Sequence, residues 1–175
     1  MITSSTPVEV PATGTYAIDP ARSKVEYSGR HMFGLGVVHA VFSIVCGKLI
    51  VTDPLAGSRV EVLLDASSFT SNNAKRDKDV RSGPLLDVAT YPDITFESDD
   101  LREEGDQWKL SGTVTAHGSA VPVEITIDQL TVEGGGLRVH ARAAHLDRHR
   151  FGITGSKGFV GRYLDLNLDA YAVPA

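Results

Sequence analysis

The sequence predicts an all-β domain of eight antiparallel strands, with one short helix inserted between the third and fourth strands. Apolar and polar residues alternate with a period of two along eight segments, and turn residues separate most of them. Only one stretch outside these segments is compatible with a helix. Short connections favour antiparallel neighbours. Eight such strands form either two packed sheets or one closed barrel, and alternation alone does not choose between them.

The first two strands differ in character. The segment 24–31 carries Val25, Tyr27, Gly29 and His31 on one face. The segment 37–51 is a long run rich in β-branched residues, so we expect it to be strongly buried or bent, with a bulge at Gly47.

The other six strands place Val, Ile, Leu or Ala on one face and polar residues on the other. They span 59–67, 93–98, 108–117, 121–130, 137–145 and 163–171. Small residues on these faces, such as Gly112, Ala141 and Ala143, would leave room inside the domain where a large side chain would fill it.

The helix is predicted over 74–81, in a stretch crowded with charges. Asn72 or Asn73 can cap it, because a short side-chain acceptor satisfies an unpaired backbone N–H, and Gly83-Pro84 ends it. Asp77 and Arg81 are four residues apart, so opposite charges are expected to meet on the helix surface. The connection from about 70 to 91 is long for a compact β domain, and such loops are usually functional.

Composition excludes several classes of protein. The chain has 175 residues, which suits one domain, and its net charge of -5 argues against non-specific nucleic-acid binding. No segment is long and apolar enough for stable membrane insertion. The first residues lack a signal-peptide pattern, so a cytoplasmic location is expected, or a periplasmic or secreted one if a leader has been removed. Residues 1–13 are predicted to be a flexible tail and residues 14–175 a single domain.

The residues that could carry chemistry do not form a recognised site. His140 and His145 would point to opposite faces of a strand, so with His149 they are poor joint ligands and no metal is expected. Cys46, the single cysteine, lies in an apolar strand and is expected to be a buried, inert thiol. The segment "GITGSKG", 152–158, departs from the phosphate-loop pattern and is better explained as a hairpin loop.

The order of these features resembles the YceI-like family, the polyisoprenoid-binding, lipocalin-like proteins. The matching pieces run from Tyr16 to about Ala172. They include "YAIDPARSKVEY", "HAVFSIVCGKL", "LLDASSFTSNNAKRDKDVRSGPLLDVATYPDITFES", "LSGTVTAHGSAVPVEI" and "DRHRFGI". The resemblance implies an up-and-down, eight-stranded antiparallel barrel whose interior holds an isoprenoid lipid or isoprenoid quinone. Members of the family often pair, so a homodimer is also an expectation.

On this resemblance the protein is expected to be a non-enzymatic binding or carrier protein, with no cofactor besides a bound isoprenoid lipid or quinone. The expected contacts to the apolar tail are Phe42, Val62, Leu64, Phe96, Val114 and Phe151. The candidates for the polar end of the ligand, or for a network that fixes the loop over it, are His31, Arg76, Asp77, Arg81 and Arg148.

Two alternatives stay open at this point. One is an enzyme for a hydrophobic substrate, with Asp77, His31 or His149 as acid–base groups and without a recognised nucleophile. The other is a packed β scaffold whose surface binds a protein partner.

Overall fold

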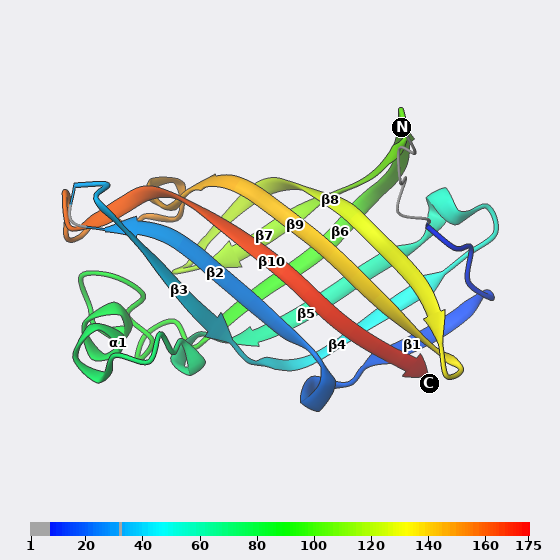
Figure 1. Cartoon of the computed structure of the whole chain (residues 1–175), viewed down its shortest axis with the longest axis horizontal. Helices are drawn as coiled ribbons and strands as arrows, with labels where there is room; N and C mark the ends of the chain where they lie inside the picture. Colours follow the sequence, from blue (N-terminus) through cyan, green and yellow to red (C-terminus); the bar gives the residue numbers. More distant parts are fainter. Residues whose placement is uncertain (1–7, 32) are drawn as a thin grey trace.

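The computed structural model describes residues 8–31 and 33–175 (Figure 1). Its strands are β1 (Gly14–Ile18), β2 (Lys24–His31), β3 (Gly36–Phe42), β4 (Ile44–Val51), β5 (Arg59–Asp65), β6 (Asp93–Glu104), β7 (Gln107–Ala116), β8 (Ser119–Glu133), β9 (Gly136–Asp147) and β10 (Val160–Pro174). The α-helix in this part of the chain is α1 (Ala74–Arg81). Short 3-10 turns are η1 (Pro20–Arg22), η2 (Leu55–Gly57), η3 (Ala66–Ser68) and η4 (Arg148–Phe151).

The strands form one antiparallel sheet that closes into an eight-stranded barrel. The circle runs β1-β4-β5-β6-β7-β8-β9-β10, and β10 returns to pair with β1. The β2–β3 hairpin extends the sheet along the remaining edge of β10. Two neighbouring positions around the barrel are therefore each occupied by two strands, one after the other. β1 and β2 both pair with β10, and β4 and β3 occupy the next position, paired with β1 and β2. The expected barrel with a short helical insertion is confirmed.

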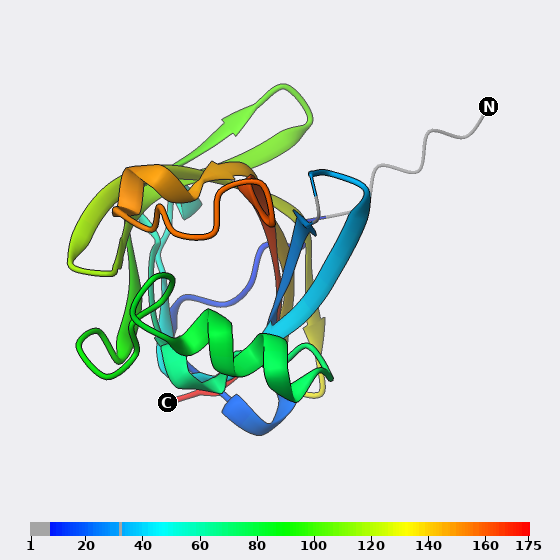
Figure 2. The same cartoon turned by 90° about the vertical axis from the view of Figure 1, so that its left-hand side faces the viewer.

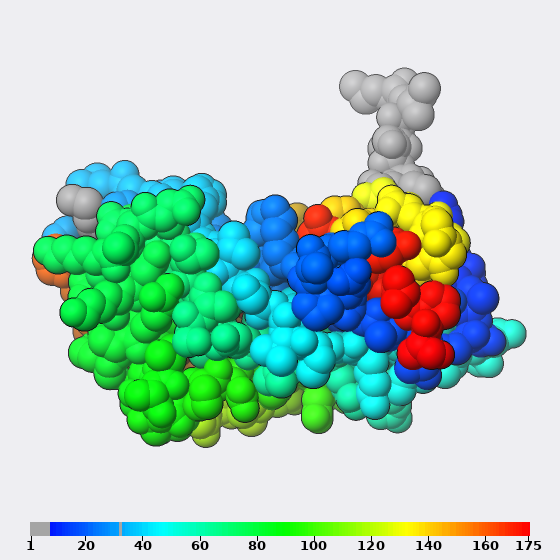
Figure 3. All heavy atoms as spheres, turned by 90° about the horizontal axis from the view of Figure 1, so that it is seen from below, coloured from blue at the N-terminus to red at the C-terminus, as the bar shows by residue number. Residues whose placement is uncertain are grey.

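A change of partner at Ser43 opens one end of the barrel. The Ser43 N–H donates to Ser68 Oγ at 2.7 Å, and the Ser43 carbonyl accepts from the Asp65 N–H at 3.1 Å. On the β3 side of Ser43 the chain is not paired with β5, and Val41 exchanges two backbone hydrogen bonds with Thr70 instead. The β5–β6 connection, residues 66–92 with α1, consequently lies across this end (Figure 2) and forms a continuous surface there (Figure 3).

The helix has the predicted bounds, and Asn73 is its cap, with Oδ1 accepting from the Arg76 N–H at 3.1 Å. The prediction of a surface charge pair is wrong for Asp77. This carboxylate is buried, only 4% exposed, and is held by groups at 70 and 71. Sequence spacing predicts which helical residues are neighbours, but not which face the tertiary structure covers.

Two expectations for the segment 37–51 are wrong. Cys46 is exposed, and the irregularity in β4 falls between Ile44 and Cys46 rather than at Gly47. The bulge adds one residue to β4 there, so Val45 and Cys46 both point outward. A strict period of two would have placed Cys46 on the same face as the buried Ile44.

The first residues described lie along β8. Val8 forms a parallel bridge with Leu130, and the Glu9 N–H donates to the Leu130 carbonyl at 2.9 Å. Residues 1–7 of the predicted tail lie outside the described residues.

The end of the barrel near the C-terminus is filled by side chains. This packed end comprises Tyr16, Ile18, Leu49, Val51, Leu130, Leu137 and Ala172, all buried in one apolar cluster. Ala172 is fully buried and the Tyr171 hydroxyl donates to the Glu133 carbonyl at 2.8 Å. Any free space in the barrel must therefore lie toward α1.

Candidate functional site

Two adjoining apolar cavities occupy the barrel interior. The larger has a volume of about 430 Å³ and lies toward α1, and the smaller, about 80 Å³, lies deeper. Four side chains line both: Ile94, Val114, Leu146 and Leu166. The lumen is thus a blind channel that begins beside α1 and ends against the packed end.

All six residues predicted to contact an apolar tail line this lumen. Phe42 and Phe151 line the larger cavity, and Val62, Leu64 and Phe96 line the smaller one. Val114 lies between the two cavities and lines both. Five of them lie in strands, where alternation marks the inward face, whereas Phe151 lies in the turn η4 and was expected from the family resemblance. Ligand contact itself stays a prediction.

Lumen residues on the connections were missed. Phe69, Val80, Leu85 and Leu86 come from the β5–β6 connection, and Ile153 and Phe159 come from the segment before β10. These segments have no periodicity that marks one face. The pair Leu85-Leu86 in an otherwise charged loop was the one signal for them in the sequence.

The small residues have two different roles. Ala141 and Ala143 line the smaller cavity, as expected. Gly112 instead makes room for a neighbour, because a Cβ there would lie 2.6 Å from the Phe96 ring. A Cβ at Gly29 would likewise collide with the Tyr27 side chain. At these two glycines the space is taken by aromatic rings and is not free for a ligand.

Most ionisable side chains that line the lumen lie at its α1 end. His31, Arg76 and Arg148 line the larger cavity, as do Tyr27, Arg30 and Asp79, which were not predicted as site residues. Burial raises the pKa of the Tyr27 phenol, and the charge of Arg148 opposes this effect. Tyr27 therefore stays neutral and can donate a hydrogen bond.

Arg148 is a buried cation, only 3% exposed. Its guanidinium donates to the carbonyls of Ile153 at 2.7 Å, Gly161 at 2.9 Å and Val160 at 3.0 Å. No carboxylate of the described residues lies within 4.0 Å of it. Burial lowers the pKa of Arg148, while Tyr27 and Asp147 oppose the decrease. A buried positive charge that contacts carbonyl oxygens but no carboxylate favours an electron-rich group in the adjoining cavity.

Asp77 and Arg81 do not line the lumen. Asp77 accepts from the Ser71 N–H at 3.0 Å and from the Ser71 hydroxyl, and Thr70 Oγ1 lies 3.4 Å away. Arg81 donates to the Phe69 carbonyl. These two residues tie α1 to the chain at 69–71, next to the point where Thr70 pairs with Val41 of β3.

Replacing Asp77 with asparagine should loosen this attachment. Burial raises the pKa of Asp77, but the Ser71 hydrogen bonds, Arg81 and Thr70 outweigh it and hold the pKa below the ordinary 3.8. The amide can replace only part of this acceptor set, so we expect Asp77→Asn to cost about 1–2 kcal/mol in the free energy of unfolding. Urea titration of the wild type and the variant measures this loss of stability.

The same shift fixes the direction of a pH effect. Because the folded-state pKa is depressed, the stabilisation from Asp77 is present above pH 3.8 and is lost as the pH falls through the folded-state value. The stability difference between the wild type and Asp77→Asn should therefore shrink below pH 3.8. A difference that stays constant from neutral to acid pH would contradict this account.

The groups considered for acid–base catalysis are not brought together. His31 lines the lumen, Asp77 does not, and His149 lines a separate groove on the outside of the barrel. Among residues 8–31 and 33–175, no group of three His, Cys, Asp or Glu side chains could hold a metal ion. In the same part of the chain, no helix is long and apolar enough to cross a membrane.

Comparison with known proteins agrees with this architecture. A UPF0312 protein of Yersinia pestis (strain Pestoides F) is 29% identical over 164 residues, which cover 86% of this chain and 85% of that protein. Protein YceI of Salmonella newport (strain SL254) is 30% identical over 114 residues, 60% of each chain.

Solved structures share the fold at low sequence identity. BcnA of Burkholderia cenocepacia superposes with a TM-score of 0.78 at 20% identity, over 89% of this chain and 99% of that one. A polyisoprenoid-binding domain from Saccharophagus degradans gives 0.65 at 12% identity, over 94% of this chain and all of that one. The model of the YceI-like domain family matches residues 16–172, and the chain therefore belongs to the YceI-like family.

Proposed function

We propose that this protein is a non-enzymatic carrier that holds an isoprenoid lipid, or an isoprenoid quinone, with its tail in the barrel lumen. The observation that carries the proposal is the blind apolar channel with polar groups gathered at one end. The larger cavity falls within the range of roughly 300–1,000 Å³ that is typical of small-molecule sites. The solved structure of a polyisoprenoid-binding domain with this fold supports the ligand class.

The chemistry of the lining fits a lipid with a small polar head. The tail would lie along the side chains that line the deeper part, where hydrophobic burial contributes about 0.8 kcal/mol per carbon taken from water. A lipid drawn from a bilayer is already in an apolar medium, so this gain largely cancels. Contacts of the head group with Tyr27, His31 and Arg148 would then decide loading. Such a balance suits a carrier that both takes up and releases its ligand.

A quinone satisfies these contacts. Its carbonyl oxygens accept hydrogen bonds, and the Tyr27 hydroxyl and the remaining Arg148 N–H groups are donors at the same end of the lumen. A carrier role without chemistry is supported by the separation of Asp77 and His149 from His31.

Organic extraction of the purified protein followed by mass spectrometry tests the proposal. We expect a prenylated lipid or quinone in the extract, and binding of an added prenyl quinone by protein from which the lipid has been removed. Repeated absence of any apolar ligand, together with no binding of prenyl quinones, would refute it.

A further inference from the structure

Three large apolar side chains are exposed at the α1 end of the barrel. Phe33 and Leu35, in the β2–β3 turn, are 74% and 88% exposed, and Phe159, just before β10, is 62% exposed. The Phe33 and Phe159 rings are in contact, with centroids 5.5 Å apart. We call these three residues the apolar tip. Exposed side chains of this size that adjoin one another mark an interaction surface more often than isolated ones do.

The apolar tip adjoins the opening of the lumen. Phe159 is exposed and also lines the larger cavity, so one side of its ring faces the lumen and the other faces solvent. Seen end-on, the β2–β3 hairpin, the segment before β10 and the connection with α1 surround this end (Figure 2). A surface that contacts the tip would therefore also contact the entrance to the lumen.

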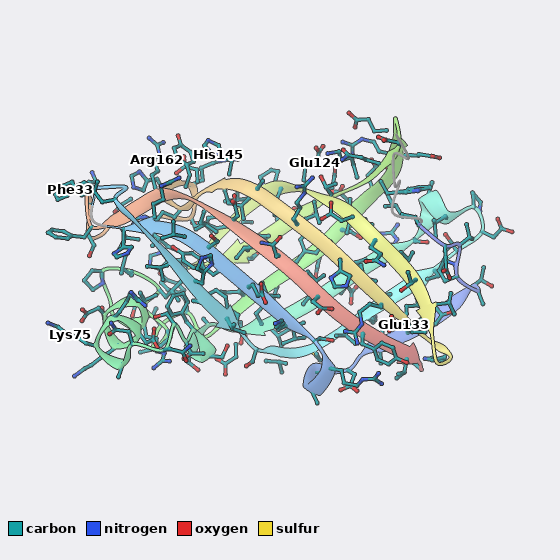
Figure 4. The ribbon with its side chains drawn as sticks, viewed as in Figure 1. Phe33, Lys75, Glu124, Glu133, His145 and Arg162 are labelled. Carbon is teal, nitrogen blue, oxygen red and sulfur yellow. The ribbon has the colours of Figure 1, made fainter. Side chains whose placement is uncertain are left out.

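Basic side chains outnumber acidic ones in the lining of the lumen and of the outer groove beside the tip. Arg30 and Lys157 line the outer groove beside Phe33, and neither has a carboxylate of the described residues within 4.0 Å. Asp147 is paired with Arg162 at 2.9 Å, whereas Asp165, which lines the groove and accepts from the His145 N–H, and Asp79 of α1, which lines the larger cavity, have no cation of the described residues within 4.0 Å. Lys75 of α1 lies at this same end, whereas Glu133 lies at the other (Figure 4). This arrangement contrasts with the chain's net charge of -5.

We propose that the apolar tip docks onto a bilayer that contains anionic lipids, so that the ligand passes between the membrane and the lumen without crossing water. The proposal rests on the proposed lipid-carrier function. A bilayer explains both features together, because exposed aromatic and aliphatic side chains insert at the interface and basic residues near it are drawn to anionic head groups. An acidic protein would account for the charge but not for apolar groups at the lumen entrance.

Vesicle sedimentation tests the docking. The full chain is mixed with vesicles of phosphatidylcholine alone, or of phosphatidylcholine with phosphatidylglycerol. We expect binding to the anionic vesicles only, and a decrease as salt is raised. The double variant Phe33→Asn, Leu35→Ser should bind about tenfold more weakly, because it removes both inserting side chains. Asparagine at 33 tolerates the positive φ of 58° found there.

A second variant separates charge from insertion. Lys75→Gln with Lys157→Gln, at two positions that do not line the larger cavity, should lose about 25-fold in binding, because each basic residue near the surface contributes about 1 kcal/mol, roughly fivefold. Val132→Ser is the matched control for the loss of apolar side chains from the tip. This exposed apolar side chain lies beside Glu133 at the far end, and its loss should leave vesicle binding unchanged.

Lumen binding is measured in parallel, with a short-chain prenyl quinone in solution. If the tip variants keep this binding but lose vesicle binding, the docking proposal is supported. Equal binding to neutral and anionic vesicles, or equal loss with Val132→Ser, would overturn it. Binding of the tip to an acidic protein, without binding to vesicles, would also overturn it. Failure of quinone binding in the wild type would instead count against the carrier function, whatever the vesicles show.

Discussion

Val114→Trp is expected to weaken binding of a long prenyl chain at least a hundredfold. Val114 lines both cavities, so an indole there would fill the passage from the larger cavity to the smaller one. Each isoprene unit has five carbons, and excluding one unit costs about 4 kcal/mol at ~0.8 kcal/mol per carbon for a ligand taken from water. That amounts to nearly three orders of magnitude in affinity, and repacking of neighbouring side chains should recover part of it.

Titration with prenyl quinones of different length measures the effect. A chain short enough to fit in the larger cavity should lose less affinity than one that must reach the smaller cavity. Thr115→Trp is the matched control, because Thr115 is exposed on the outer face of β7 and tryptophan is well tolerated in strands. If both variants bind long and short chains as the wild type does, the ligand does not lie along this channel.

Alternation predicted the strands because most of them have one face against the lumen and one in solvent. It failed where that condition fails. β1 has only five residues, and β6 continues six residues beyond the predicted end at Ser98, to Glu104. In that extension Leu101 is the inward-facing apolar residue, and the charged residues on both sides of it obscure the alternation in the sequence. The choice of a barrel over two sheets came from the family resemblance, because closure depends on the pairing of β1 with β10, which no local pattern encodes.

The apolar half of the site was more predictable than the polar half. Phe42, Val62 and Phe96 line the lumen as their strand positions require. The charged residues share no such rule, since Arg148 faces the lumen while Asp77 lies in the attachment of α1. A buried charged side chain can line a cavity or bind backbone groups. The outcome depends on how the connections fold over the barrel.

Arg148→Met is the second change with a large expected effect, and its cause is an interruption in β10. The pairing of β10 with β2 shifts register between Val160 and Leu164. In that interval the carbonyls of Val160 and Gly161 accept from Arg148, which also holds the Ile153 carbonyl. Methionine replaces the aliphatic stem of arginine but has no donors. It would leave three carbonyls without their partner.

Two terms oppose each other in this substitution. Removing an unpaired buried cation relieves a desolvation cost. Leaving buried acceptors unsatisfied costs about 1–3 kcal/mol for each group, and three are affected. Because water can reach carbonyls near the lumen opening, we expect a net loss of about 3 kcal/mol. For a domain of this size that corresponds to a decrease of roughly 6–12 °C in Tm, measurable by calorimetry.

Two further variants separate the geometry of Arg148 from its charge. Arg150→Met, at an exposed position two residues away, should change stability by no more than about 0.5 kcal/mol. Arg148→Lys keeps the charge, but a single ammonium cannot span three carbonyls as the planar guanidinium does, so it should recover only part of the lost stability. Equal Tm values for Arg148→Met and Arg150→Met would show that the three carbonyl bonds do not hold the segment before β10 in place. Full recovery by lysine would show that the charge alone is sufficient.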